Sequence, residues 1–136
     1  MTYLTRATAA AGAVLAAGLL VAGPAQAASR ATPSGDWLYL TVTRGESPSI
    51  DSHGTLLRCD PPRGHPHAAD ACAGLAAAGG DIARIPQKDV FCPMIYAPVT
   101  ARAHGEWNGR PVEFQETYAG KCVMNARTGS VFALDD

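Results

Sequence analysis

Four cysteines restrict the folds open to this chain more than any other feature of its sequence. They are Cys59, Cys72, Cys92 and Cys122. An even number of cysteines in a small secreted chain is typical of two disulfides. Four cysteines allow three pairings, and their spacing alone does not choose among them. The pairing of sequence neighbours closes the shorter loops, and each bridge would stabilise the fold by about 2–4 kcal/mol.

The N-terminal residues indicate that the chain is exported. Residues 7–23 contain no charged side chain, follow a single arginine, Arg6, and precede the small-residue sequence Pro24-Ala25-Gln26-Ala27. This pattern is typical of a secretory signal peptide, residues 1–27, cleaved at or near Ala27. A membrane anchor is the alternative, although residues 7–23 are only at the lower edge of the length that spans a bilayer.

Residues 28–136 would then form one small extracellular domain. Its first residues, 28–35, are rich in Ser, Thr, Pro and Gly, which predicts a flexible N-terminal arm. The whole chain has a formal net charge of −1 and no basic run. Nucleic acid and anionic membrane surfaces are therefore not expected as partners.

Zinc is the alternative use of the first two cysteines. Cys59, His65, His67 and Cys72 offer two sulfurs and two imidazoles within a short stretch. The stretch has no Cys-x-x-Cys pair, however, and an oxidising compartment favours disulfides over thiolates. We therefore expect no metal and no other cofactor, and we interpret both histidines as part of a polar loop, residues 60–67.

Apolar residues alternate with polar ones along several segments, which predicts β-strands. Residues 37–43 have this pattern, and residues 55–59 form a second short strand after a loop at 44–53. Residues 131–134 are apolar and predict a further strand near the C-terminus.

A hairpin and a helix complete the predicted elements. Asn108-Gly109 separates residues 99–107 from residues 110–118, and Asn-Gly is the strongest signal for a two-residue hairpin turn. Pro111 near the start of the second arm suggests an edge strand or a strand entry.

Residues 70–78 predict a helix with Asp70 as N-cap and Gly79 as its left-handed stop, and residues 81–88 can hold a further short turn. About five strands and one or two helices, without alternation of strand and helix, predict an α+β domain with an antiparallel sheet.

The segment Phe91-Cys92-Pro93-Met94-Ile95-Tyr96 is the strongest candidate for a functional site. It is apolar, and its cysteine and proline stiffen the backbone. A rigid, extended, apolar segment would suit a protease that binds it as a substrate. The alternative is a buried strand or a structural loop beside a disulfide, because apolar runs usually belong to the core.

A secreted hydrolase is a second alternative. Asp51-Ser52-His53 contains the residue types of a catalytic triad, but adjacent residues cannot face one another as a triad requires. The chain also has no Gly-x-Ser-x-Gly sequence. We therefore do not expect an enzyme.

Five longer motifs are present between about Trp37 and Phe132: Cys-x(12)-Cys at 59–72, Ala77-Ala78-Gly79-Gly80-Asp81, Cys92-Pro93-Met94-Ile95-Tyr96-Ala97-Pro98-Val99, Trp107-Asn108-Gly109 and Cys122-Val123-Met124-Asn125-Ala126. Together they resemble the motifs of the Streptomyces subtilisin inhibitor family of secreted serine-protease inhibitors. The resemblance implies a five-stranded antiparallel sheet with one longer and one short helix. It also implies the pairing Cys59–Cys72 and Cys92–Cys122, and a homodimer packed through the sheet.

The resemblance further implies a substrate-like, tight-binding inhibitor of serine endopeptidases, both subtilisin-like and chymotrypsin-like, with its reactive bond between Met94 and Ile95. Met94 would enter the specificity pocket of the protease and Phe91 a second apolar pocket. The rest of the protease-contacting loop would be Cys92, Pro93 and Tyr96.

The sequence departs from the family at Ala97, where many relatives have an acidic residue, and in its C-terminal extension, Leu134-Asp135-Asp136. The first departure leaves the binding details open on the C-terminal side of the reactive bond. A secreted binding module that shares the fold without inhibiting proteases is the alternative function.

Overall fold

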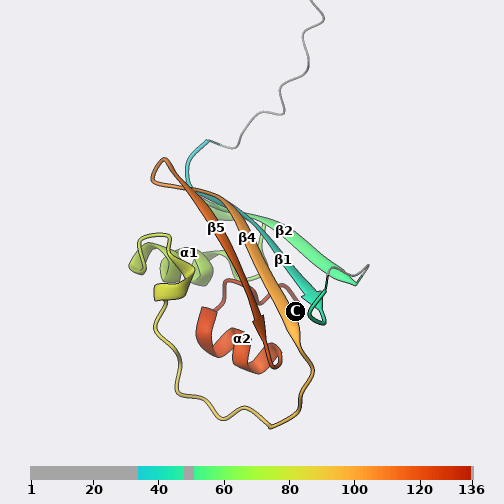
Figure 1. The fold of residues 1–136 in the computed structure, drawn as a ribbon. Coiled ribbons are helices and arrows are strands. Elements are labelled where there is room, and N and C mark those ends of the chain that lie inside the picture. The colour runs from blue at the N-terminus through green and yellow to red at the C-terminus, as the bar shows by residue number, and fades with distance from the viewer. Residues whose placement is uncertain (1–33, 48–50, 136) are drawn as a thin grey trace, which may run out of the picture. The chain divides into compact units, whose positions relative to one another are not determined.

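Five antiparallel strands form one sheet in the computed structural model, which describes residues 34–47 and 51–135 (Figure 1). The strand order is β3-β2-β1-β4-β5. The strands are β1 (Trp37–Arg44), β2 (Ser52–Cys59), β3 (Pro62–Arg63), β4 (Val99–Trp107) and β5 (Arg110–Tyr118). The expected signal peptide, residues 1–27, and most of the expected N-terminal arm, residues 28–35, lie outside the described residues.

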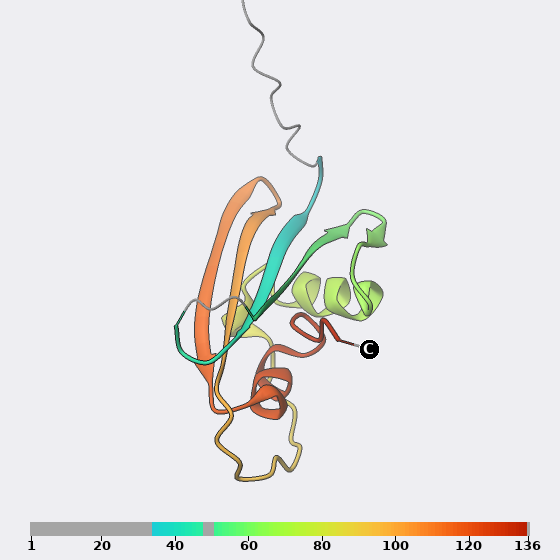
Figure 2. The same cartoon turned by 90° about the vertical axis from the view of Figure 1, so that its right-hand side faces the viewer.

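Two α-helices and one turn of 3-10 helix accompany the sheet. They are α1 (Ala68–Ala77), η1 (Ile82–Arg84) and α2 (Lys121–Thr128). Figure 2 shows both α-helices on the same side of the sheet, and no helix of residues 34–47 and 51–135 lies on the other side, which we call the uncovered face. The predicted class, an α+β domain with a five-stranded antiparallel sheet and two helices, is confirmed.

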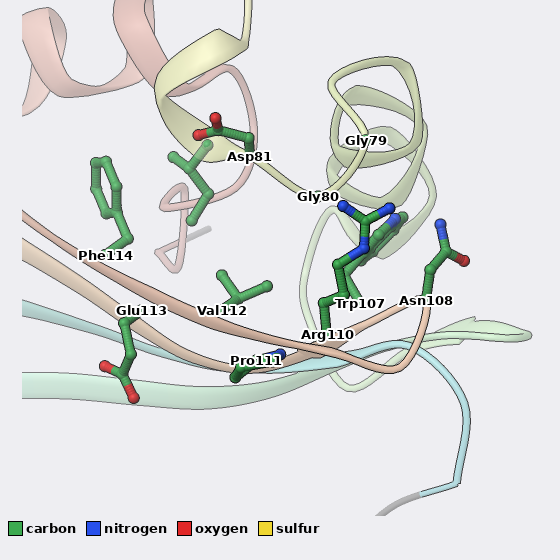
Figure 3. Close-up of a pocket in the computed structure, with 11 residues that line it drawn as sticks. Gly79, Gly80, Asp81, Trp107, Asn108, Arg110, Pro111, Val112, Glu113 and Phe114 are labelled. Carbon is green, nitrogen blue, oxygen red and sulfur yellow. The ribbon is translucent and has the colours of Figure 1, made fainter.

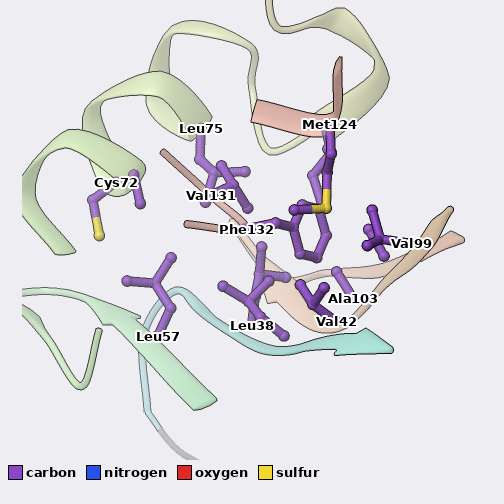
Figure 4. Close-up of a cluster of buried hydrophobic side chains, with 14 of the residues drawn as sticks. Leu38, Val42, Leu57, Cys72, Leu75, Val99, Ala103, Met124, Val131 and Phe132 are labelled. Atoms are coloured by element: carbon purple, nitrogen blue, oxygen red, sulfur yellow. The ribbon is translucent and has the colours of Figure 1, made fainter. Parts of the chain in front are cut away.

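The core lies between the sheet and the two helices. Alternate residues of β1, namely Leu38, Leu40 and Val42, point into it and are buried, as the pattern of residues 37–43 predicts. Leu75 of α1 and Met124 of α2 meet them from the helical layer (Figure 4). Burial of these side chains on one face of each element holds the helices on the sheet.

The hairpin of β4 and β5 forms as predicted. Asn108 and Gly109 have φ angles of 48° and 74°, and two consecutive positive values are those that a type I′ turn requires. The amide of Asn108 also donates a hydrogen bond to Asp36 Oδ1, at 2.7 Å. β5 is an edge strand, which agrees with the position of Pro111.

Helix α1 begins three residues earlier than predicted and stops at Gly79 as predicted. His67, not Asp70, is its N-cap. Asp70 instead lies in the first turn, where its negative charge interacts favourably with the positive end of the helix dipole. At the other end Gly79 has a φ of 64°. The amide of Gly79 donates to Ala76 O at 3.2 Å and that of Gly80 to Leu75 O at 2.8 Å, which is the pattern of a Schellman motif.

Two predictions on strands are wrong. β2 begins at Ser52 rather than residue 55, so the end of the predicted loop 44–53 belongs to the sheet. Residues 131–134 form no strand: their amides bond locally, as from Ala133 to Ser130 O, while Phe132 is buried in the core. The fifth strand is instead β3, two residues that the sequence placed in a polar loop.

Helix α2 was not located from the sequence. It begins after Gly120 without a side-chain cap, and only Met124, Ala126 and Thr128 of its residues are buried. This pattern is too short and too polar to give a clear helical period. The helix is held by its packing on the sheet and by the disulfide at Cys122.

His65 corrects the interpretation of residues 60–67 as a simple polar loop. Its ring is buried, and Nδ1 accepts a hydrogen bond from the amide of His67 at 2.8 Å. Nε2 therefore carries the proton and donates to Val131 O at 3.0 Å. Burial lowers the pKa of this imidazole, and the neutral ring links the start of α1 to the C-terminal segment.

The turn after α1 gives a test of the fold. A Cβ on Gly80, whose φ is 83°, would lie 2.3 Å from Cγ of Trp107 (Figure 3). Gly80→Ala should therefore lower the free energy of unfolding by about 2–4 kcal/mol, through backbone strain and a clash in the core. Urea unfolding of the disulfide-bonded protein measures the change.

Two matched variants separate strain from crowding. Gly79 has a positive φ but open space around its Cβ position, so Gly79→Ala should cost only about 1–2 kcal/mol. Gly74, within α1, has neither a positive φ nor a close neighbour, so Gly74→Ala should stabilise by about 0.5–1 kcal/mol. Equal effects of the three substitutions would contradict the role of Trp107.

Candidate functional site

The candidate site is the connection between η1 and β4. Residues 85–98 have no helix or strand, and they project beyond α2 (Figure 1). Long connections without secondary structure are uncommon in small domains and are usually functional. This connection contains the whole of the predicted segment 91–96, which we call the exposed loop.

The exposed loop presents its large apolar side chains to solvent. The relative exposure is 94% for Phe91, 102% for Met94 and 70% for both Ile95 and Tyr96. These values contradict the alternative of a buried strand. Met124, the other methionine of residues 28–136, is 1% exposed, as expected for a core residue. Several large apolar side chains exposed side by side are typical of an interaction surface.

A disulfide attaches the exposed loop to the core. Cys92 pairs with Cys122, whose Cα atom is 5.7 Å away, and Cys59 pairs with Cys72. Both pairs are those that the family resemblance implied. Cys122 lies in the first turn of α2, and Met124 of the same helix is buried against the sheet. The backbone two residues before Met94 is thus covalently joined to an element of the core.

The sulfurs that a zinc site would need are therefore bonded to each other at Cys59 and Cys72. His67 lies exposed at the start of α1, whereas His65 is buried. Within residues 34–47 and 51–135, no three side chains of His, Cys, Asp or Glu gather in a way that would hold a metal ion.

Hydrogen bonds hold the two ends of the connection. On the N-terminal side, the amide of Lys88 donates to Ala126 O of α2 at 2.8 Å. On the C-terminal side, the amide of Ala97 donates to Ala119 O at 2.9 Å, and Pro98 O accepts from the amide of Gly45 at 2.7 Å. The exposed loop is thus fixed on both sides of Met94.

The backbone turns at Met94. The amide of Ile95 donates to Pro93 O at 2.9 Å, which closes a three-residue turn with Met94 at its centre. The sequence predicted an extended segment, and this turn is a departure from it. The Met94 side chain, at the centre of this turn, is fully exposed.

A hollow of about 500 Å³ lies between the exposed loop and the start of α2. Its walls include Pro93, Ile95, Gly120 and Val123. A Cβ on Gly120 would lie 3.7 Å from Ile95 O, so the loop backbone passes directly over this residue. The loop therefore crosses the N-terminal end of α2 with a hollow between them.

Tyr96 makes a contact that the sequence did not indicate. Its hydroxyl donates a hydrogen bond to Glu46 Oε1, at 2.5 Å, from the turn that follows β1. The bond and the negative charge of Glu46 raise the pKa of the Tyr96 phenol. The two residues are far apart in the sequence, and no local pattern connects them.

The residues considered for a hydrolase do not form a catalytic arrangement. Ser52 and His53 are successive residues of β2, so their side chains point to opposite faces of the sheet. The hydroxyl of Ser52 lies 2.9 Å from that of Thr43 on the neighbouring strand, as in an ordinary cross-strand pair.

A second hollow, of about 340 Å³, lies near the β4–β5 turn (Figure 3). Trp107, Arg110 and Asp81 are among its lining residues. Asp81 is the N-cap of η1, and its Oδ1 accepts a hydrogen bond from the amide of Ala83 at 3.0 Å. This carboxylate therefore has a structural partner, and none of the predicted site residues lines this hollow.

These features define a small disulfide-bonded domain that presents one anchored, apolar loop. The chain belongs to the subtilisin inhibitor-like family, whose model matches residues 34–120. The solved structure of sermetstatin from Streptomyces caespitosus, in complex with Bacillus licheniformis subtilisin, is similar to this chain. The TM-score is 0.56 and the sequence identity 34%, over 71% of this chain and 96% of that one.

Named relatives agree with this assignment. A protein of Streptomyces avermitilis, provisionally named a serine protease inhibitor, is 60% identical over 92% of this chain and 86% of its own length. The subtilisin inhibitor of Streptomyces albogriseolus is 42% identical over 71% of each chain. A trypsin inhibitor of Streptomyces longisporus is 38% identical over 84% of this chain and 88% of its own length.

Proposed function

We propose that this protein is a secreted, substrate-like inhibitor of serine endopeptidases and that its reactive bond joins Met94 to Ile95. The observation that carries the proposal is the full exposure of Met94 on a loop that a disulfide fixes two residues away. The family and the complex of its relative with subtilisin support the same class of partner. The first test is the residual activity of subtilisin after incubation with the secreted protein.

Binding follows from the shape and stiffness of the exposed loop. Met94 is long, unbranched and polarisable, so it suits the apolar specificity pocket of subtilisin-like and chymotrypsin-like enzymes. Phe91 would fill a second apolar pocket of the same cleft. The disulfide and Pro93 already restrict the backbone of the loop, so the loop loses little conformational entropy when it binds the protease. More of the contact energy therefore appears as affinity.

Inhibition follows from what happens after attack. The serine oxygen of the protease adds to the Met94 carbonyl carbon, the bond to Ile95 nitrogen breaks, and an acyl-enzyme and a free Ile95 amine form. Hydrolysis would then require water at the acyl carbon. If the Ile95 amine stays in place, it attacks the same carbon, re-forms the peptide bond and releases the serine hydroxyl. A high local concentration of this amine favours religation.

Export is part of this proposal, because the targets are extracellular enzymes. Residues 1–27 have the pattern of a signal peptide, and two disulfides suit an oxidising compartment. In the part of the chain that the structure describes, no helix is long and apolar enough to cross a membrane. A non-inhibitory binding module is the alternative function, and failure to inhibit any serine protease would favour it.

The identity of residue 94 should set the choice of protease. Met94→Lys should strengthen trypsin inhibition by about 100-fold or more, since the trypsin pocket holds a carboxylate that pairs with lysine. It should weaken subtilisin inhibition by about tenfold, because a charge enters an apolar pocket. Inhibition constants for both enzymes measure the effect.

Two controls accompany this substitution. Met94→Leu keeps an apolar side chain and should retain the preference for subtilisin. Val90→Lys places the same charge on a half-exposed neighbour and should not increase trypsin inhibition. If Met94→Lys gains no trypsin inhibition while the fold is intact, Met94 does not occupy the specificity pocket.

The Cys92–Cys122 bridge should make inhibition lasting. A cut after Met94 divides the chain into two parts, and only this bridge joins them covalently, because Cys59 and Cys72 both precede the cut. Cys92→Ser with Cys122→Ser should therefore give inhibition that decays during incubation. Mass spectrometry should show fragments that end at Met94.

The pair Cys59→Ser with Cys72→Ser is the matched control. Loss of either bridge should lower the free energy of unfolding by about 2–4 kcal/mol, but the control keeps both parts of a cut chain together. Inhibition by the control should last at temperatures where it is folded. Permanent inhibition by a folded variant without Cys92 and Cys122 would contradict the role of the bridge.

We also propose that the protein is a homodimer packed through the uncovered face of its sheet. Trp37, Tyr39 and Leu56 lie on that face, together with His104 of β4. The ring of His104 is 5.3 Å from that of Tyr39 and 6.3 Å from that of Trp37, so these side chains form one aromatic cluster. Tyr39 is still 41% exposed, which leaves apolar surface for a second copy.

A charge in this cluster should separate the subunits. Tyr39→Glu should raise the dissociation constant of the dimer by about 100-fold, because the carboxylate would be buried without a partner. Sedimentation equilibrium measures this change. Asp70→Lys, on α1 behind the sheet, is the control and should have no effect on association. Identical sedimentation of all three proteins as monomers would exclude the dimer.

A further inference from the structure

The hydrogen bond between Tyr96 and Glu46 lies beside Ile95, on the C-terminal side of the reactive bond. A cut at the reactive bond would create two new ends, Met94 and Ile95. The Met94 end lies two residues from Cys92 and is held by its disulfide. The Ile95 end has no disulfide in the exposed loop, and the first side-chain hydrogen bond after the cut, among the described residues, is that from Tyr96 to Glu46.

The carboxylate of Glu46 is held in position by the turn that follows β1. Gly45 has a φ of 89°, and its amide donates to Pro98 O at 2.7 Å. Gly45 O in turn accepts from the hydroxyl of Thr100, at 2.8 Å. The turn is therefore fastened to the start of β4, immediately after the exposed loop, and the Tyr96–Glu46 bond extends this attachment by two residues toward the reactive bond.

We propose that Glu46 is a positioning residue that holds Tyr96, and through it the Ile95 amine, beside the acyl-enzyme. The proposal rests on the proposed inhibitory function. In this arrangement the disulfide fixes the acyl side of the cut, and Glu46 fixes the amine side. Together with the main-chain bond from Ala97 to Ala119 O, it keeps the amine close enough for religation to compete with hydrolysis.

The chemistry of the contact suits this role. A charged acceptor gives a stronger hydrogen bond than a neutral one, and the bond to Glu46 raises the pKa of the Tyr96 phenol, so that the donor stays protonated to higher pH. Both side chains are exposed, so the bond should add little to global stability. The bond should instead affect the ratio of cut to intact protein, because this ratio depends on how well the residues next to the reactive bond are held in place.

Four variants test the proposal: Glu46→Ala, Glu46→Gln, Tyr96→Phe, and Glu46→Ala combined with Tyr96→Phe. Each is incubated with catalytic subtilisin, and mass spectrometry follows the fraction cut after Met94 until it is constant. Glu46→Ala and Tyr96→Phe should each raise the ratio of cut to intact protein by about two- to tenfold, the effect of one hydrogen bond. Glu46→Gln keeps an acceptor and should restore most of the wild-type ratio.

The double variant should have the same ratio as either single variant, because both substitutions remove one contact. Thermal unfolding temperatures should be the same in wild type and all four variants. If Glu46 instead stabilised the whole fold, the variants at this position would unfold at lower temperature. Ultraviolet titration provides an independent readout: the phenol of Tyr96, identified by its absence in Tyr96→Phe, should ionise at lower pH in Glu46→Ala than in wild type.

The outcomes separate this inference from the proposed function. If wild type inhibits subtilisin and the four variants have its ratio of cut to intact protein, Glu46 does not position the amine. Additive effects in the double variant would equally overturn the proposal. If wild type does not inhibit subtilisin at all, the proposed function fails and this inference fails with it.

Discussion

The disulfide between Cys92 and Cys122 is the bond on which the arrangement of the exposed loop depends. Residues 85–98 have no strand partner and almost no buried side chains, so they cannot hold one conformation by packing. The bridge instead joins the loop to α2, whose Met124 is buried in the core. The loop is thus covalently joined to a helix that packs in the core, although the loop itself contributes little to the hydrophobic stability of the domain.

The structure separates the residues that stabilise the fold from those that present the loop. Leu38, Leu40 and Phe132 are buried between the sheet and the helices, whereas Phe91 and Met94 remain in solvent. Substitution at the tip of the loop should therefore leave the core intact. This separation is physically consistent with relatives of one fold that are named inhibitors of subtilisin and of trypsin. A side chain that is exposed at the tip of the loop can be exchanged without disturbing the packing of the core.

Local patterns predicted the elements that local interactions form. The alternation in β1, the Asn108-Gly109 turn and the left-handed stop at Gly79 each depend on neighbouring residues, and each is confirmed. Residues 131–134 were misread because an apolar run indicates burial but not a hydrogen-bonding partner. Helix α2 and strand β3 were missed because they are short and are held by contacts with distant parts of the chain.

The sequence by itself determined the number of disulfides, the α+β class and the candidate segment around Met94, because these follow from residue types and their spacing. It did not determine whether that segment was buried, since an apolar run suits a core strand and a binding loop equally. Only the tertiary structure exposed Met94, brought Glu46 to Tyr96 and buried His65 against Val131. The two contacts join residues far apart in the chain, and their proximity is set by how the sheet and helices pack rather than by any local pattern.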